Sequence, residues 1–270
     1  MRLDTGPFRE ALAAADLFVA EEQARALLAD GLPLVDLYDV VVEVLDDIGD
    51  RWARGRLRVA DEHLATAAAE MLVARLRGAP TAAHLGTVLL VTLEGERHVF
   101  GLHVLAHLLE QRHFRAVVAG ELPPEEIGAL AGRSQDLLAV GIGMHDPPAR
   151  GALTAPLRLI RAAAPRVRIL LGGRAFRDAT ARGGRHGADA VCDGARAALA
   201  LLEEWASPLS PREREVLRAV AEGLTNAEAG AALGISAETV KAHMDAVFAK
   251  LGVSTRASAV ALGLRRGWLR

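Results

Sequence analysis

The sequence predicts a multidomain protein: a four-helix bundle, then a parallel α/β sheet, then an all-α helix-turn-helix. Three observations lead to this prediction. Apolar residues recur at three- and four-residue steps through residues 1–78. Short apolar runs alternate with helical stretches across residues 87–205, and helical segments broken by glycine turns return after residue 207. We therefore place the domains at 1–80, 85–206 and 207–270.

Composition excludes several classes of protein. Hydrophobic residues make up 51% of the 270 residues and charged residues 24%, a balance typical of globular proteins and not of disordered charged tails. No apolar run reaches the roughly 18 residues that a membrane span needs, and the first residues lack the pattern of a signal peptide. The single cysteine, Cys192, excludes a disulfide framework and a cysteine-rich metal site. We expect a soluble, cytoplasmic protein without membrane contact.

The N-terminal part is predicted to form an antiparallel bundle of four helices joined by short loops. Pro33 suits the first turn of the third helix, and Gly31 suits the end of the second. The predicted helices span residues 7–15, 18–30, 33–54 and 59–77.

The central part is predicted to be a flavodoxin-like (Rossmann-like) parallel sheet with helices on both faces. In such sheets, ligands bind beyond the carboxyl ends of the strands. Glycine-rich or polar loops follow three of the predicted strands, at 94–96, 141–143 and 172–173. The predicted strands are residues 88–93, 115–118, 137–141, 167–171 and 188–192.

The C-terminal part is predicted to be a helix-turn-helix. Ser210, Pro211 and Glu213 form the start signal of one helix, and Ser236 is placed to cap a later one. Residues 207–270 contain nine basic and six acidic residues, a net charge of +3, so the rest of the chain carries −5. This asymmetry is expected if only the C-terminal part meets a polyanion. Four apolar residues at helical spacing are predicted core: Val240, Met244, Val247 and Leu251.

This segment resembles the LuxR/FixJ DNA-binding domain over nearly its whole length, through the runs 209–217, 222–228, 233–243 and 250–253. The resemblance implies that helix 237–250 lies in the major groove of double-stranded DNA, and we expect a homodimer or higher oligomer. Departures are Ala229, where the family favours isoleucine, and the acidic Asp245. A degenerate domain used only for dimerisation is the alternative. The residues expected at the DNA are Ser236, Glu238, Thr239, Lys241, Ala242 and His243.

The loop after the first predicted strand contains a candidate metal ligand. Glu96, His98 and Gly101 form the pattern Glu-x-His-x-x-Gly. One imidazole nitrogen can coordinate a metal while a carboxylate such as Glu96 orients the other nitrogen, and Gly101 would let a bulky ligand approach the backbone. A loop histidine without any ligand role is the alternative. A second histidine pair, His103 and His107, has metal-capable spacing but no evident third ligand.

The His98 segment resembles the cobalamin-binding Asp-x-His-x-x-Gly motif, with Glu96 in place of Asp. The resemblance implies that His98 is the lower axial ligand of cobalt, and that Gly172 and Gly173 lie against the nucleotide tail of the cofactor. The family has Ser-x-Leu or Ser-x-Thr after the third strand, where this chain has Gly143-Met144-His145. The missing serine hydroxyl removes one expected hydrogen bond to the tail.

A second motif lies at the end of the predicted bundle, where Trp52 is followed after nine residues by Glu62 and His63. A core tryptophan beside a solvated helix start is the alternative. With the run 48–52, Ile-Gly-Asp-Arg-Trp, the pattern resembles light-sensing cobalamin proteins of the CarH type. The resemblance implies that these three residues line the adenosyl pocket of adenosylcobalamin. In that type a histidine directly after the tryptophan binds cobalt after illumination; Ala53 occupies that position here.

Together these features predict a non-enzymatic, cobalamin-dependent, light-responsive one-component transcription regulator. Two alternatives stay open. One is a corrinoid methyl-carrier protein, which shares the bundle and the α/β domain but has no use for a DNA-binding domain. The other is a regulator whose sensor binds a different or additional chromophore, such as a bilin, or a partner protein.

Overall fold

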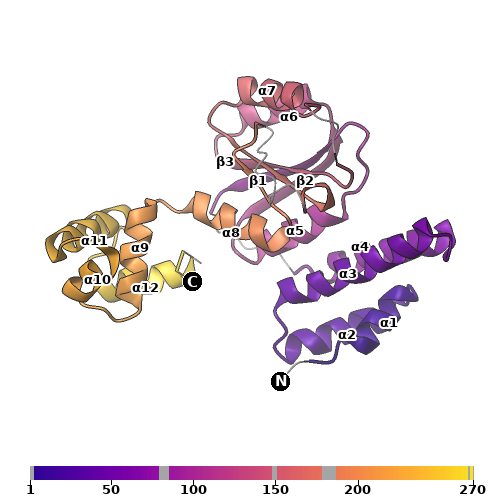
Figure 1. Ribbon diagram of the computed structural model, residues 1–270, viewed down its shortest axis with the longest axis horizontal. Coiled ribbons are helices and arrows are strands. Elements are labelled where there is room, and N and C mark those ends of the chain that lie inside the picture. Colours follow the sequence, from indigo (N-terminus) through magenta and orange to yellow (C-terminus); the bar gives the residue numbers. More distant parts are fainter. Residues whose placement is uncertain (1–2, 79–84, 148–150, 178–186, 267, 270) are drawn as a thin grey trace. The chain divides into compact units, whose positions relative to one another are not determined.

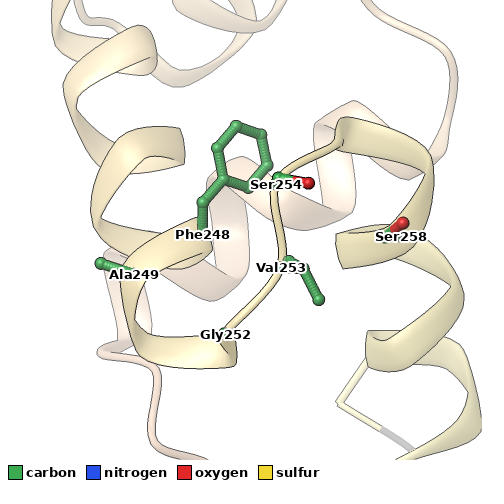
Figure 2. Close-up of a pocket in the computed structure, with 6 residues that line it drawn as sticks. All are labelled: Phe248, Ala249, Gly252, Val253, Ser254 and Ser258. Carbon is green, nitrogen blue, oxygen red and sulfur yellow. The ribbon is translucent and has the colours of Figure 1, made fainter.

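A computed structural model describes the whole chain except residues 1–2, 79–84, 148–150, 178–186, 267 and 270 (Figure 1). The chain forms two compact units, Met1–Leu199 and Ala200–Arg270. The first unit contains a helical bundle and a parallel sheet, and the second contains a group of helices. Helix α8 (Ala195–Ala206) spans the division between them.

The bundle consists of α1 (Gly6–Ala13), α2 (Leu17–Ala29), α3 (Leu34–Ala53) and α4 (Val59–Leu76), which all contact one another. Each boundary lies within two residues of the sequence prediction, so the four predicted helices are confirmed. Helix α2 begins where the Asp16 carboxylate accepts a hydrogen bond from the backbone N–H of Val19 at 3.1 Å. Fully buried core residues of the bundle include Phe8, Leu12, Leu37, Tyr38, Val41, Leu72 and Val73.

The sheet consists of β1 (Thr87–Leu93), β2 (Arg115–Leu122), β3 (Leu137–Gly143), β4 (Arg168–Gly172) and β5 (Ala190–Val191). All paired strands are parallel, in the order β2-β1-β3-β4-β5. Helices α6 (Pro124–Arg133) and α7 (Thr154–Ala163) cover one face, and α5 (Phe100–Glu110) lies on the other (Figure 1). This order is that of flavodoxin-like sheets, the fold class that the sequence predicts for this part. The chain reverses direction across the sheet between β1 and β3, so the crevice at their carboxyl ends is the expected ligand position.

Strand β2 is longer than the sequence predicts. Its register against β1 shifts between Leu90 and Val91, and on the β2 side Gly120 has a φ of 70°. Glycine adopts this left-handed backbone without strain, and the bulge lets the strand continue to Leu122 instead of ending at Val118. The extension brings Glu121 to the loop that follows β1, where its Oε1 accepts a hydrogen bond from the Gly95 N–H at 2.7 Å.

The sheet has an aliphatic core. Strand β1 is buried along its whole length, and β3, β4, α6 and α7 contribute Val140, Ile142, Leu171, Ile127 and Ile160 to the same cluster. Cys192 follows β5 and is buried, and burial raises the pKa of its thiol to about 11. This side chain therefore acts as a small core residue.

A buried polar contact joins the bundle to α5. The Tyr38 hydroxyl of α3 lies 2.6 Å from Nδ1 of His107, and neither side chain is more than 2% exposed. The His107 Nε2 lies 3.2 Å from the amide nitrogen of Gln111, so both ring nitrogens have partners. His107 is therefore not available to form a metal site with His103. Beside this contact, Arg77 forms an ion pair with Glu110.

The C-terminal unit is built from α9 (Pro211–Ala221), α10 (Asn226–Leu233), α11 (Ala237–Leu251) and α12 (Arg256–Arg265) around one core. Ser210 and Glu213 form the predicted capping box, through hydrogen bonds between each side chain and the other's backbone N–H. Val240, Met244 and Val247 are buried as predicted, and Leu251 is partly buried. No single described helix is long and apolar enough to cross a membrane; only the bent pair α11–α12 meets that test, when its helices are taken together.

The Tyr38–His107 contact predicts a pH dependence of stability. Burial, assisted by the positive charge of Arg77 and opposed by Glu110, lowers the pKa of His107 from its ordinary 6.5 to about 4. Between these values the unfolded chain binds a proton that the folded protein does not, so the free energy of unfolding falls as pH decreases from 6.5 towards 4. At pH 4 the loss should approach about 3 kcal/mol.

Urea unfolding of wild type and His107→Gln across this range measures the effect. Because other groups titrate in the same window, the relevant quantity is the difference between the two pH profiles. The variant should lose part of the acid-induced destabilisation, and parallel profiles would contradict the prediction.

Candidate functional site

The Glu96 carboxylate connects the loops that follow β1 and β3. Its Oε1 accepts hydrogen bonds from the His98 backbone N–H at 2.9 Å and from the His98 ring Nδ1 at 2.6 Å. Its Oε2 accepts a hydrogen bond from the His145 backbone N–H at 2.7 Å. The Glu96 carbonyl accepts a further bond from the buried Thr92 hydroxyl at 2.7 Å. One side chain thus holds both loops at the reversal point of the sheet.

The electrostatics of this carboxylate favour its charged form. Partial burial alone would raise the pKa of Glu96, but the hydrogen bonds from the backbone N–H groups of His145 and His98 and from the His98 ring lower it below its ordinary value. An ionised Glu96 accepts a hydrogen bond from His98 Nδ1–H. In the neutral imidazole with this tautomer, the other ring nitrogen, Nε2, carries the lone pair that can coordinate a metal.

The His98 side chain is largely exposed, and one face of its ring is covered by another ring. Its side chain is 60% exposed, and no hydrogen bond to Nε2 is found among the described residues. The His145 ring stacks on it with a centroid distance of 4.0 Å and an interplanar angle of 20°. Burial, followed by the nearby charges of His98 and Arg174, lowers the pKa of His145 below its ordinary value.

Four glycines were predicted to lie against the cofactor. At two of them an added side chain would find space, and at the other two it would meet close neighbours. A side chain at Gly101 would meet no atom within 4 Å, which leaves that approach open, and one at Gly172 would make only ordinary contact. A Cβ at Gly143 would lie 2.8 Å from the Leu102 side chain, so Leu102 occupies the position where the expected serine would extend. A Cβ at Gly173 would lie 2.3 Å from the Met144 carbonyl oxygen, and Gly173 has a φ of 108°. Glycine at 173 is therefore required by the protein's own backbone.

Ion pairs connect the C-terminal half of α3 to the loop after β4. Arg174 lies 3.4 Å from Asp46 and 3.5 Å from Asp50, and Arg177 lies 2.6 Å from Asp46. Arg174 directly follows Gly173 at the carboxyl end of β4. The end of α3 is therefore held beside the same edge of the sheet as the two loops that Glu96 joins.

Trp52, Glu62 and His63 lie where α3 passes into α4. Trp52 belongs to the last turn of α3 and is 47% exposed, which excludes a core anchor. Glu62 accepts a hydrogen bond from the Thr66 hydroxyl at 3.2 Å and lies 3.5 Å from His63 Nε2, and the His63 side chain is 74% exposed. Among the described residues, no ring contact or hydrogen bond links Trp52 to this pair, although all three lie at the same end of the bundle.

Helix α11 presents an exposed polar face. Glu238, Thr239, Lys241 and Asp245 are exposed, and His243 is partly buried. Ser236 caps the helix as predicted: its Oγ accepts from the Thr239 N–H at 3.0 Å and lies 2.8 Å from the Thr239 hydroxyl. Lys241 therefore presents a cation on this face beside a capped helix start, an arrangement suited to a DNA phosphate or a base edge.

Part of the positive charge of this unit stabilises its own fold. Lys250 donates to the buried Glu213 at 2.7 and 2.9 Å. Burial would raise the pKa of Glu213, but Lys250 and the Ser210 capping bonds hold it below its ordinary value. Arg212 bonds the Leu233 carbonyl at 2.6 Å, and Arg256 bonds the Leu224 carbonyl. The net charge of +3 therefore overstates the number of cations that can reach a polyanion.

The sequence prediction missed several residues of these sites. Thr92, Glu121 and Arg174 anchor the loops around His98, but no local pattern distinguishes them from ordinary strand and loop residues. Gly230 in α10 was also missed. A Cβ added at this position would lie 2.7 Å from the Ile235 carbonyl oxygen, so the absence of a side chain lets α10 approach the start of α11 closely. The glycine in the middle of a short helix was the available signal.

The donor set around His98 fits a metal that brings most of its own ligands. The described residues contain no group of three or more His, Cys, Asp or Glu side chains that could hold a metal ion. A single exposed histidine with an oriented ring suits a macrocyclic metal complex to which the protein supplies one nitrogen. The residues present therefore fit a corrinoid.

Two segments match models of known protein families. Residues 8–77 match the model described as "B12 binding domain", and residues 207–262 match that described as "Bacterial regulatory proteins, luxR family". The chain therefore combines a B12-binding helical domain with a LuxR-type helix-turn-helix domain.

Known proteins resemble these parts separately. "Probable transcriptional regulatory protein SgaR" of Hyphomicrobium methylovorum is 56% identical over 54 residues, 20% of this chain and 26% of that protein. The transcriptional activator RamA of Corynebacterium glutamicum is 51% identical over 61 residues, 23% of this chain and 22% of that protein. The chain thus spans about a quarter of the length of these relatives. The monomethylamine corrinoid protein of Methanosarcina barkeri matches with a TM-score of 0.59 and 19% identity, covering 73% of this chain and 96% of that one. The similarity to the corrinoid protein shows that the two chains share a fold.

Proposed function

We propose that the protein is a transcription regulator that binds a cobalamin at the carboxyl ends of β1 and β3 and double-stranded DNA through α11. The geometry of Glu96 and His98 is the observation that supports the proposal most strongly. A carboxylate orients one ring nitrogen at 2.6 Å, and the exposed ring offers the other nitrogen at the reversal point of the sheet. In this proposal the LuxR-type domain in the same chain binds DNA and so passes the state of the cobalamin site on to transcription.

In this proposal His98 Nε2 would coordinate the cobalt, and Gly101 would leave room for the macrocycle. The loop after β4, at Gly172 and Gly173, would hold the nucleotide tail. The position expected to hold a serine hydroxyl carries Gly143 and is covered by Leu102, so the tail must be held without that bond.

Trp52, Glu62 and His63 face the upper side of the cofactor in the same proposal. Trp52 offers an exposed indole surface, and Glu62 and His63 offer polar groups, which together suit an adenosyl group. A bound alkylcobalamin would supply a cobalt–carbon bond that visible light can break. The end of α3 that carries Trp52 is attached to the sheet by exposed ion pairs, so a change at this pocket can alter how the bundle is held.

Two alternative hypotheses about the function predict different observations. A corrinoid methyl carrier needs the bundle and the sheet but not a capped α11 with an exposed Lys241. A regulator with another chromophore, such as a bilin, would not need the Glu96–His98 pair. The absorption spectrum of protein purified with cobalamin, in the dark and after illumination, separates these readings.

The lower-ligand assignment predicts that His98→Ala abolishes cobalamin binding or weakens it strongly, because no other described side chain offers a ring nitrogen oriented by Glu96. Equilibrium dialysis and the visible spectrum measure the effect. His113→Asn removes an exposed imidazole elsewhere, at a left-handed position (φ 61°) that asparagine tolerates, and serves as the control. Tight binding by His98→Ala with an unchanged spectrum would contradict the assignment.

The DNA-binding assignment predicts that Lys241→Ala weakens binding to a specific duplex by about 1–3 kcal/mol if the lysine contacts base edges bidentately. The wild type should bind as a homodimer or higher oligomer on a repeated site. Fluorescence anisotropy with promoter fragments near the protein's own gene provides the measurement, and equal thermal unfolding of the two proteins excludes a folding defect. Failure of both the full chain and residues 207–270 to bind any such fragment would count against the proposal.

The upper-face assignment predicts that illumination of the adenosylcobalamin-loaded protein changes its visible spectrum and its DNA affinity. Because Ala53 cannot ligate cobalt, the illuminated product should differ from a bis-histidine species unless His63 moves in. Comparison of wild type with His63→Ala decides this point. A bis-histidine spectrum in both proteins would rule out His63, and an unchanged spectrum after illumination would rule out light sensing.

A further inference from the structure

We infer that His145 is a positioning residue for the proposed cobalt ligand: its ring stacks on His98 and fixes the plane in which Nε2 is presented. This inference rests on the proposed function, because it concerns how the chain prepares His98 for a metal. His145 is not itself expected to touch the cobalt.

Hydrogen bonding alone leaves the His98 ring incompletely fixed. Glu96 accepts from Nδ1 at 2.6 Å, which restrains the ring edge that carries this nitrogen but is a contact in the ring plane and supports neither ring face. The His98 side chain is 60% exposed, so packing around it is sparse. A flat surface against one ring face supplies the missing restraint, and the His145 ring lies there at 4.0 Å with its plane inclined by only 20°.

The backbone of His145 makes the stack rigid. Its N–H donates to Glu96 Oε2 at 2.7 Å, so the residue that covers His98 is attached to the residue that orients it. The preceding residue is held as well: Met144 N–H donates to the Gly172 carbonyl at 3.0 Å, and the Met144 carbonyl accepts from Ala175 N–H at 3.2 Å. The stacking ring is therefore carried by a loop that is hydrogen-bonded to the end of β4, to the turn that follows it and to the loop after β1.

Substitution of the side chain alone can test this role. The hydrogen bond to Glu96 comes from the main chain, so His145→Ala keeps it and removes only the ring. His145→Phe restores a flat ring without a nitrogen. The pair separates stacking from any contribution of the imidazole nitrogens, and His113→Asn again controls for the loss of an exposed histidine.

The experiment loads the full-length proteins with cob(II)alamin and records electron paramagnetic resonance spectra, in which a coordinating nitrogen splits the cobalt lines. Wild type and His145→Phe should show uniform splitting by one histidine nitrogen. His145→Ala should show a mixture with an uncoordinated form, and its cofactor affinity should fall about 10-fold or more, as is typical when a partner that orients a metal ligand is lost.

A uniform, wild-type spectrum and affinity for His145→Ala would overturn the inference, and so would a failure of His145→Phe to restore the signal. Failure of the proposed function looks different. In that case wild type and His98→Ala give the same spectrum, whatever residue stands at 145.

Discussion

The hydrogen bonds of the Glu96 carboxylate are the interaction on which the arrangement of the loops around His98 depends. Parallel strands end at a common edge, but nothing in a sheet fixes the loops beyond that edge relative to one another. Glu96 does so by accepting hydrogen bonds from both loops, and its charged form is favoured by those same donors. One ionised side chain thus restrains an edge of the His98 ring and holds the backbone of His145 next to it, and the stacked His145 ring then restrains the plane of His98.

The contacts between the bundle and the sheet are of two kinds. The Tyr38–His107 hydrogen bond is buried and neutral: burial raises the pKa of the phenol and lowers that of the imidazole, so neither group carries charge near pH 7. The pairs of Asp46 and Asp50 with Arg174 are exposed, and such pairs contribute only about 0–1 kcal/mol each. The bundle is thus firmly attached at α5 and weakly attached at the Trp52 end of α3, where a bound group could most readily alter its position.

Local patterns were sufficient for most of the fold and for part of the site. Helical periodicity located all four bundle helices, and capping signals at Ser210 and Ser236 located two helix starts in the C-terminal unit. The end of β2 was predicted too early, because Gly120 resembles a strand terminator and its role in a bulge depends on pairing with β1. Glu121, Arg174 and the stacked ring of His145 were missed for the same reason: their partners come from other strands or helices, and no sequence spacing encodes them.

The close approach of Gly173 to the Met144 carbonyl limits what retention of this glycine can indicate about ligand binding in related chains. The contact arises inside the protein, whether or not any ligand is present. A descendant that no longer bound a ligand here would still be selected to keep glycine at this position and the Glu96 carboxylate that joins the loops, while His98 would be free to change. Among distant homologues, a retained glycine at 173 therefore indicates that the loop geometry is kept, and only a retained histidine at 98 indicates that the proposed binding chemistry is kept as well.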